Sequence, residues 1–224
     1  ANTAKVGITT DQAALIDGVT ATTAELNIMD GVTATAVELN LLDGVTSLNS
    51  GATNLNGLSD VLVEDNSIYI ISDPSSTTDD AQYNVAIGVA ALDAVTTGDH
   101  NIAVGLNALY NNTTGIRNTA LGTNTLRANS EGSNNIAIGY NSLYYNEGDK
   151  NSAIGFNSLF YNTSGDNNTA LGYYAGDIIQ GGSNNVMLGF ATDPSSNDGT
   201  NQIVIGYSAT GQGDNTVTLG NADV

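Results

Sequence analysis

A five-residue motif with apolar residues at fixed positions, which we call the phrase, recurs along the last two thirds of the chain. The phrase ends in Gly at positions 88, 105, 122, 139, 155, 172, 189, 206 and 220, spaced by 17 residues except for one interval of 16 and a last one of 14. The residue before each Gly is Ile, Val or Leu, and eight of the nine residues three before Gly are β-branched. Such residues favour strands. The pattern therefore predicts one short strand per phrase, stacked into a mainly all-β, parallel β-solenoid.

A column of small residues lies between the two large columns of each phrase. Because successive side chains of a strand point to opposite faces, the large columns share one face and the small column has the other. We expect the large face to fill the inside of each coil. The small face is then expected to be the face on which another chain packs closely. Its members are Ala86, Ala103, Ala120, Ala137, Ala153 and Ala170.

Asn opens most of the phrases, and a second Gly column follows them. Asn bonds its own backbone at turns, and identical amides stacked at strand spacing bond along a ladder. We therefore predict an Asn ladder. The second Gly column predicts turns with a positive φ angle. The ladder comprises Asn84, Asn101, Asn118, Asn135, Asn151, Asn168 and Asn185, and the second column comprises Gly98, Gly115, Gly132, Gly148, Gly165, Gly182 and Gly199.

A different repeat of 13 residues precedes the solenoid, with "DGVT" at Asp17, Asp30 and Asp43. Thr22 with Glu25 fits a capping box that starts a helix, as does Thr35 with Glu38, so we predict short helical turns. A non-helical coil is the alternative. The predicted organisation is a shaft over 1–60, a connector over 61–82 and the solenoid over 83–224, with a loop excursion near 191–200.

Composition narrows the classes of function. The 224 residues include 4 Lys and Arg and 23 Asp and Glu, for a net charge of -19, which repels nucleic acid and anionic membrane surfaces. The chain has no Cys, which excludes disulfides and thiolate sites. It also has no apolar run near the roughly 20 residues that span a bilayer. Its first residues lack a signal core, which suggests an internal or processed piece.

Few residues offer catalytic chemistry. The single histidine, His100, precedes a phrase at a corner, where a solvated turn residue is the simpler interpretation. Paired carboxylates serve glycosidases, but the pairs Glu64/Asp65, Asp79/Asp80 and Glu147/Asp149 all fall in predicted loops. We therefore expect no enzymatic activity and no cofactor.

Two oxygen-rich loops are candidates for Ca²⁺, which takes carboxylate and carbonyl ligands. Three associated chains would also carry a charge that divalent ions relieve. Diffuse counterions are the alternative. The candidate ligands are Asp73, Asp79, Asp80, Asp193 and Asp198.

Aromatic residues follow the phrase Gly in the later coils. They predict a surface stripe, either a packing ladder along the rod or a surface that contacts sugars, because aromatic side chains combine an apolar face with a polar tip. Tyr144, Tyr145, Phe160 and Tyr161 lie nearby in the sequence. The stripe comprises Tyr140, Phe156, Tyr173, Phe190 and Tyr207.

The phrases "NTALGTNTL", "NIAIGYNSL" and "NSAIGFNSL" resemble repeats of bacteriophage tail fibres. They are also similar to the head repeats of trimeric autotransporter adhesins, which form a left-handed parallel β-roll. The "TAVELNLLDGVTS" repeat resembles one found in fibre and appendage proteins of cyanophages. The resemblance implies a homotrimeric, extracellular or virion fibre that contacts other fibre proteins and a host-surface glycan or protein.

We therefore expect a structural, non-enzymatic fibre segment that acts as a rigid spacer for host attachment. The alternative is a bacterial surface adhesin or extracellular filament of the same architecture, and a third possibility is a polysaccharide-depolymerising tailspike. Nucleic-acid binding and membrane insertion are not expected.

Overall fold

The computed structural model describes residues 61–64, 66–70 and 80–221. The predicted shaft over 1–60, with its capping boxes and its non-helical alternative, lies outside these residues. So do Asp73 and Asp79.

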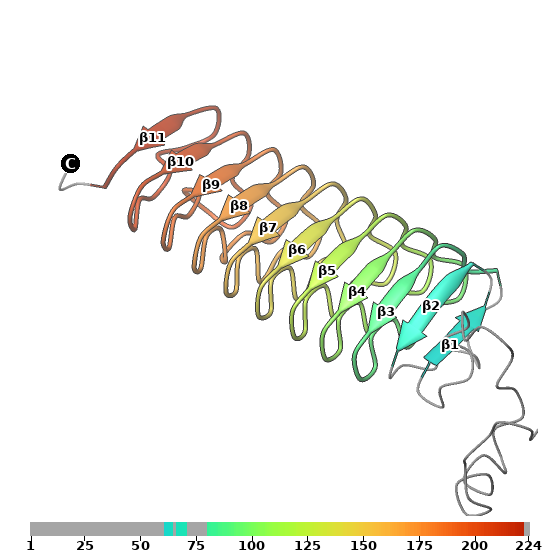
Figure 1. Cartoon of the computed structure of the whole chain (residues 1–224). Helices are drawn as coiled ribbons and strands as arrows, with labels where there is room; N and C mark the ends of the chain where they lie inside the picture. The colour runs from blue at the N-terminus through green and yellow to red at the C-terminus, as the bar shows by residue number, and fades with distance from the viewer. Residues whose placement is uncertain (1–60, 65, 71–79, 222–224) are drawn as a thin grey trace, which may run out of the picture. The chain divides into compact units, whose positions relative to one another are not determined.

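The described residues form one eleven-stranded sheet whose strands follow chain order (Figure 1). β1 (Val61–Glu64) pairs antiparallel with β2 (Ser67–Ile70), and every later neighbour is parallel. No helix occurs among the described residues. The predicted all-β parallel solenoid is confirmed. The remaining strands are β3 (Val85–Ile87), β4 (Ile102–Val104), β5 (Thr119–Leu121), β6 (Ile136–Ile138), β7 (Ser152–Ile154), β8 (Thr169–Leu171), β9 (Val186–Leu188), β10 (Ile203–Ile205) and β11 (Val217–Leu219).

The register places identical repeat positions on top of one another. In β4 and β5, for example, Ala103 pairs with Ala120 and Val104 pairs with Leu121. Each strand from β3 to β11 has only three residues, because the Gly after it turns the chain out of the sheet. The sequence period is therefore the length of one coil.

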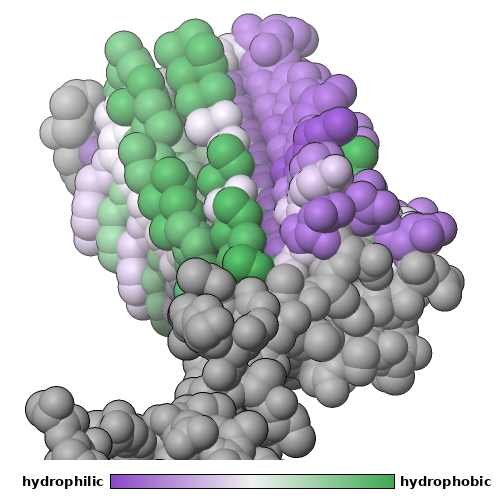
Figure 2. Space-filling view, turned by 45° about the vertical axis from the view of Figure 1, so that its right-hand side comes forward, coloured by the Kyte–Doolittle hydropathy of each residue, from purple (hydrophilic) through white to green (hydrophobic). Residues whose placement is uncertain are grey.

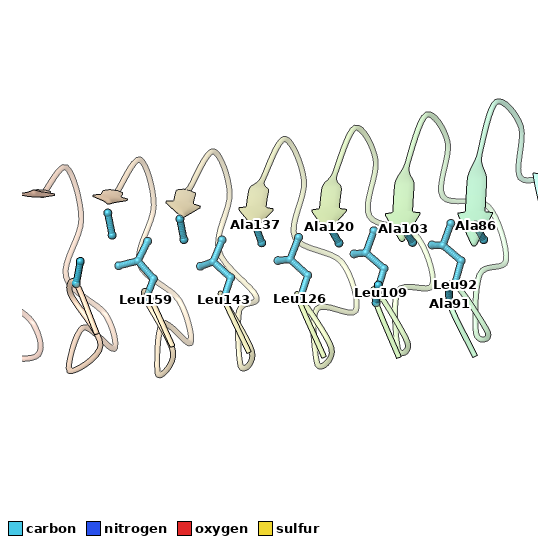
Figure 3. Close-up of a cluster of buried hydrophobic side chains, with 14 of the residues drawn as sticks. Ala86, Ala91, Leu92, Ala103, Leu109, Ala120, Leu126, Ala137, Leu143 and Leu159 are labelled. Carbon is cyan, nitrogen blue, oxygen red and sulfur yellow. The ribbon is translucent and has the colours of Figure 1, made fainter. Parts of the chain in front are cut away.

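The inside of each coil is narrow and is filled by Ala from the strand and Leu from the segment that follows the turn. Figure 3 shows the Leu side chains pointing across the interior toward the Ala side chains. Both sets are at most 1% exposed. The Leu column comprises Leu92, Leu109, Leu126, Leu143 and Leu159.

The predicted assignment of the two strand faces was wrong. The small residues are buried inside their own coil and cannot reach another chain, whereas the large residues point outward: Ile87 is 38% exposed and Leu171 is 51% exposed. The reason is steric, because Leu occupies the interior and leaves room opposite it for only a methyl group. The correction applies to Ala86, Ala103, Ala120, Ala137, Ala153 and Ala170.

The inward Leu residues have left-handed backbone conformations, with φ of 53° at Leu92 and 49° at Leu126. This conformation costs about 1–2 kcal/mol for a residue with a Cβ. Full burial of a Leu side chain contributes roughly 1.5–3 kcal/mol. Burial in the core therefore offsets the strain that directs each Leu inward.

One coil repacks this interior with different residues. Gly176 takes the Leu position after β8, and a Cβ placed there would lie 3.2 Å from Ile179 Cδ1 and 3.3 Å from Met187 Cγ. Ile179 and Met187 are both fully buried. They fill the space that Leu fills in the coils that begin with β3 to β7, which explains why Met187 replaces Ala in β9.

The two Gly columns have different physical causes. Gly105 has φ +136°, and a Cβ on it would lie 2.5 Å from Gly122 O. Gly98 and the rest of the second column do not have positive φ, so that prediction was wrong. They are Gly because of close packing: a Cβ on Gly98 would lie 2.6 Å from Gly115 O. The positive φ instead falls on the residue before the Asn column, as at His100 with φ 60°.

Two predicted boundaries also change. The solenoid begins in the predicted connector, because β2 is its first parallel rung and pairs with β3. Residues 191–200 make no excursion: Gln180 N donates to Asn197 O at 2.8 Å and Asp193 N donates to Ala209 O at 3.0 Å, so these residues keep the coil path. The Pro and Asp residues of this stretch fit a coil of ordinary length.

Replacing Gly105 by Ala is expected to destabilise the solenoid more than replacing Gly213. Gly213 has φ +140° but no atom near its Cβ position, so Gly213→Ala introduces only backbone strain of about 1–3 kcal/mol. Gly105→Ala adds an overlap with backbone worth roughly a further 1–3 kcal/mol. Guanidinium unfolding followed by circular dichroism measures both losses. Equal losses would contradict the close-packing explanation.

Candidate functional surfaces

The predicted Asn ladder is confirmed, and its bonds run between side chain and backbone. Asn84 Oδ1 accepts from Asn101 N at 2.8 Å, and Asn101 Oδ1 accepts from Asn118 N at 2.9 Å. Each Nδ2 donates to a Gly carbonyl of the second Gly column, as Asn84 Nδ2 does to Gly98 O at 2.8 Å. The bonds continue in register to Gln202, whose N donates to Asn185 Oδ1. Further rungs form at Asn135, Asn151, Asn168 and Asn185.

A second Asn ladder, which the sequence analysis missed, is also fully buried. Here amides bond directly to amides: Asn129 Nδ2 donates to Asn112 Oδ1 at 3.2 Å, and Asn146 Nδ2 donates to Asn129 Oδ1 at 2.8 Å. Asn162 Nδ2 continues to Asn146 Oδ1 at 2.7 Å. The signal was an Asn two or three residues before four of the second-column Gly residues, as in "NTTG", but this pattern is also typical of an exposed turn.

Several carboxylates act as hydrogen-bond acceptors between coils. Asp99 Oδ1 accepts from Gln82 N, Asp149 Oδ1 accepts from Ser133 N and Asp166 Oδ1 accepts from Asp149 N, each at 2.7 Å. Glu147 Oε2 accepts from Ser130 N at 3.1 Å. Both members of the predicted pair Glu147/Asp149 therefore bind backbone amides of the preceding coil. Some of the acidic side chains thus satisfy backbone N–H groups of a neighbouring coil.

His100 lies at a corner, as expected, and its ring stacks on Tyr83 with centroids 4.8 Å apart and planes at 8°. This is a stacking contact and not a Ser–His–carboxylate arrangement. His100 thus lies on the outside of the solenoid, in the column of residues that precede the Asn column.

The described Ca²⁺ candidates do not come together. Asp80 is exposed, and Asp198 Oδ1 accepts from Gly181 N at 3.1 Å. Asp193 lies beside Asp177. Among the described residues no group of three or more acidic or His side chains is placed to hold a metal ion.

Asp193 and Asp177 form a partly buried carboxyl pair that the sequence did not predict. Burial, together with the neighbouring Asp177 charge, raises the pKa of Asp193 to about 7. Burial also raises the pKa of Asp177. Asp193 Oδ1 is buried without a hydrogen-bond partner. The folded state therefore retains a proton here that the unfolded chain would release at lower pH.

The outer face of β3 to β11, which we call the sheet face, carries no charged residue among the residues that the structure describes. It consists of three columns that run from Val85 to Asn221. The first holds the residue three positions before each phrase Gly, the second holds the residue immediately before that Gly, and the third holds the residue immediately after it. Figure 2 shows apolar residues in columns along the stack, next to a separate hydrophilic side. Exposed members include Ile87, Val89, Ile102, Leu106, Ile136, Ile154, Leu171, Ile203, Ile205, Val217 and Leu219.

The predicted aromatic stripe forms a continuous stack along one edge of the sheet face. Centroids of successive rings lie 5.4, 4.9, 5.3 and 5.1 Å apart, with planes 2° to 11° from parallel. The packing ladder is thus confirmed. Stacked rings cover one another's faces, which leaves mainly ring edges for a sugar. The ladder comprises Tyr140, Phe156, Tyr173, Phe190 and Tyr207.

A second aromatic group, which we call the aromatic patch, lies on the segment across the interior from the strands. It comprises Tyr144, Tyr145, Phe160 and Tyr161. Phe160 contacts Tyr145 and Tyr161 edge to face, at 82° and 88°. Arg127 lies between Tyr110 and Tyr144, with Cζ 5.2 and 5.6 Å from their ring centroids, and its Nη1 donates to Tyr144 Oη at 3.0 Å.

The described residues contain no helix with the length and apolar character needed to cross a bilayer. Comparison of the chain with protein families, with curated proteins and with solved structures finds no significant match. The function must therefore be argued from the geometry of these surfaces.

Asn135→Ala is expected to cost about 1–3 kcal/mol, because it leaves one buried donor unpaired. This donor is Asn151 N, which donates to Asn135 Oδ1 at 2.8 Å, whereas Gly148 O loses its bond from Asn135 Nδ2 but still accepts from Asn146 Nδ2 at 2.7 Å. Asn141→Ala is the control, since Asn141 is only half-buried and bonds to the Asn124 side chain. Urea unfolding compares the two. A loss no larger than that of the control would argue against the ladder.

Asp193→Asn is expected to make the solenoid less sensitive to pH. Because the folded pKa of Asp193, about 7, exceeds the ordinary value of 3.8, the folded state binds more protons between pH 4 and 7, and stability falls as pH rises through this range. The variant should melt at a higher temperature than the wild type at pH 8, with a smaller difference at pH 5. Asp198→Asn, an exposed carboxylate of the same coil, should keep the wild-type pH dependence. A parallel pH profile for Asp193→Asn would refute the assignment.

Proposed function

We propose that this chain is a structural segment of an extracellular homotrimeric fibre, of the kind with which phages reach a host surface. The repeat phrases support this through their resemblance to tail-fibre and adhesin-head repeats. The single observation that carries the proposal is the uncharged, apolar sheet face that runs along the stack. It replaces the buried Ala column as the surface on which chains meet.

The size of the sheet face is adequate for a stable interface. Nine parallel rungs, β3 to β11, at ~4.8 Å and a face about 16 Å wide give roughly 700 Å² of planar area per chain. Specific interfaces bury about 800 Å² per partner. Long exposed apolar patches are also uncommon on monomers and mark interaction sites.

Charge favours association through this face and opposes it elsewhere. The chain carries a net charge of -19, and copies that met through an acidic side would bury like charges. All Asp and Glu side chains of residues 80–221 lie outside the three columns of the sheet face. Three chains can therefore approach along it while their carboxylates remain solvated.

The periodicity of the face favours another copy of the same chain as the partner. Large side chains recur on it once per coil, so the matching surface must repeat at the same spacing. A second and a third copy satisfy this requirement along the whole stack. The result would be a stiff spacer in which the outward Ile, Val and Leu columns become the shared interior.

The wild-type chain is expected to sediment as a trimer, and Ile136→Glu/Ile138→Glu as a monomer. Both residues lie on the outer face of β6, where Ile136 is 43% exposed, and the two carboxylates would be buried against other chains. Asn111→Glu, an exposed position on the opposite segment, adds charge without entering the sheet face and should leave the trimer intact. Analytical ultracentrifugation distinguishes these results. A monomeric wild type, or a trimeric double variant, would refute the proposal.

A further inference from the structure

The aromatic patch is local, whereas the structural columns of the solenoid are periodic. Its two columns hold aromatic pairs only in two adjacent coils, at Tyr144 with Tyr145 and at Phe160 with Tyr161. The preceding and following coils have Asp93 with Ala94, Tyr110 with Asn111, Arg127 with Ala128, and Asp177 with Ile178 at the same positions. Since those coils keep the same path, the fold does not require aromatic residues here.

The patch presents rings to solvent. Tyr145 is 43% exposed and Tyr161 is 48% exposed. Their planes are 5° apart, but their centroids are separated by 6.0 Å, more than the 4.9 to 5.4 Å of the sheet-face ladder. The two rings are therefore exposed to solvent and lie further apart than the rings of that ladder. Phe160, edge to face with both, holds them in place.

Open tyrosine rings suit a pyranose sugar. The C–H face of a sugar ring packs on an aromatic face, and the phenol hydroxyl bonds to the sugar hydroxyls. The Tyr145 and Tyr161 centroids are about one sugar ring apart along the stack. A linear chain lying along the rod would thus place successive sugars on the two rings.

The charges near the patch select among glycans. Glu147 follows it in sequence and is exposed, and Asp177 and Asp93 occupy its columns in other coils. The cation in these columns, Arg127, is held between Tyr110 and Tyr144. Carboxylates accept hydrogen bonds from neutral sugar hydroxyls and repel uronic or sialic acids. The acidic surroundings therefore complement a neutral glycan.

We propose that the aromatic patch, with Tyr145 and Tyr161 as its contact rings, binds a neutral, hydroxyl-rich polysaccharide. The inference rests on the proposed function in one respect: the patch stays accessible in a trimer because the chains meet through the sheet face. The binding is non-covalent, and the patch acts as a docking surface.

The test measures binding of the whole chain to immobilised dextran, mannan and galactan, which are neutral, and to alginate, which is anionic. The wild type should bind at least one neutral polysaccharide and not alginate. Tyr145→Ala/Tyr161→Ala should weaken that binding roughly tenfold or more, because two aromatic contacts are lost. Ala is compatible with the coil at these positions, as Ala94 and Ala128 show.

Tyr83→Ala is the matched control, because Tyr83 is a 52% exposed tyrosine outside both the aromatic patch and the sheet face, and this variant should bind as the wild type does. Absence of binding to all three neutral polysaccharides, preference for alginate, or equal loss in the control would each overturn the inference. Sedimentation of the same samples separates the two proposals. A monomer that binds through Tyr145 and Tyr161 would refute the trimer alone, and a trimer that binds no neutral glycan would refute the glycan site alone.

Discussion

Each coil of this protein depends on its neighbours to satisfy its buried polar groups. The Asn column lies inside the solenoid, and every Oδ1 in it accepts from a backbone N–H of the adjacent coil, as Asn101 Oδ1 does from Asn118 N. A buried donor or acceptor without a partner costs about 1–3 kcal/mol, so a single coil has no stable interior. The same dependence explains the nearly constant coil length, because a shifted coil would break both Asn ladders as well as the sheet register. Rigidity along the stack follows directly from this hydrogen bonding.

The close spacing also determines which side chains lie inside. Gly at the corner, Ala on the strand and Leu across the interior leave a thin core in which a second large residue has no space. The other aliphatic residues of the strands must therefore point outward, although the hydrophobic effect favours removing them from water. A solenoid this thin buries its apolar surface completely only when it associates with something of the same period. The assembly that we propose along the sheet face would thus be a consequence of how little the interior can hold.

Properties that repeat in the sequence were predictable, and properties set by packing between columns were not. The strand phrase, the Asn ladder and the stacked stripe from Tyr140 to Tyr207 each follow from one column read by itself. The two strand faces were reversed because the alternation of large and small residues shows only that the faces differ. Which face points inward depends on Leu143 and its equivalents, which lie in a different part of the coil. The buried ladder of Asn112 to Asn162 was missed because "NTTG" has the composition of a solvated turn. Asp177 and Asp193 occupy two different positions of the repeat, so the spacing within one column does not predict that they lie side by side.

The fold restricts residue identity at some positions of the coil more than at others. A ligand-binding site can arise more easily where this restriction is weak. In the proposed trimer the sheet face must repeat with the same chemistry to match another copy, and the interior must keep its small and amide residues. The segment opposite the strands has neither requirement, and its outward positions accept Asp, Ala, Asn, Arg, Tyr and Ile in different coils. The coil accepts Ala94 and Ala128 at these positions, so it does not require exposed aromatic residues there. Their concentration in two adjacent coils therefore favours the proposed ligand as its explanation, and a repetitive rod can carry a specific site without losing its register.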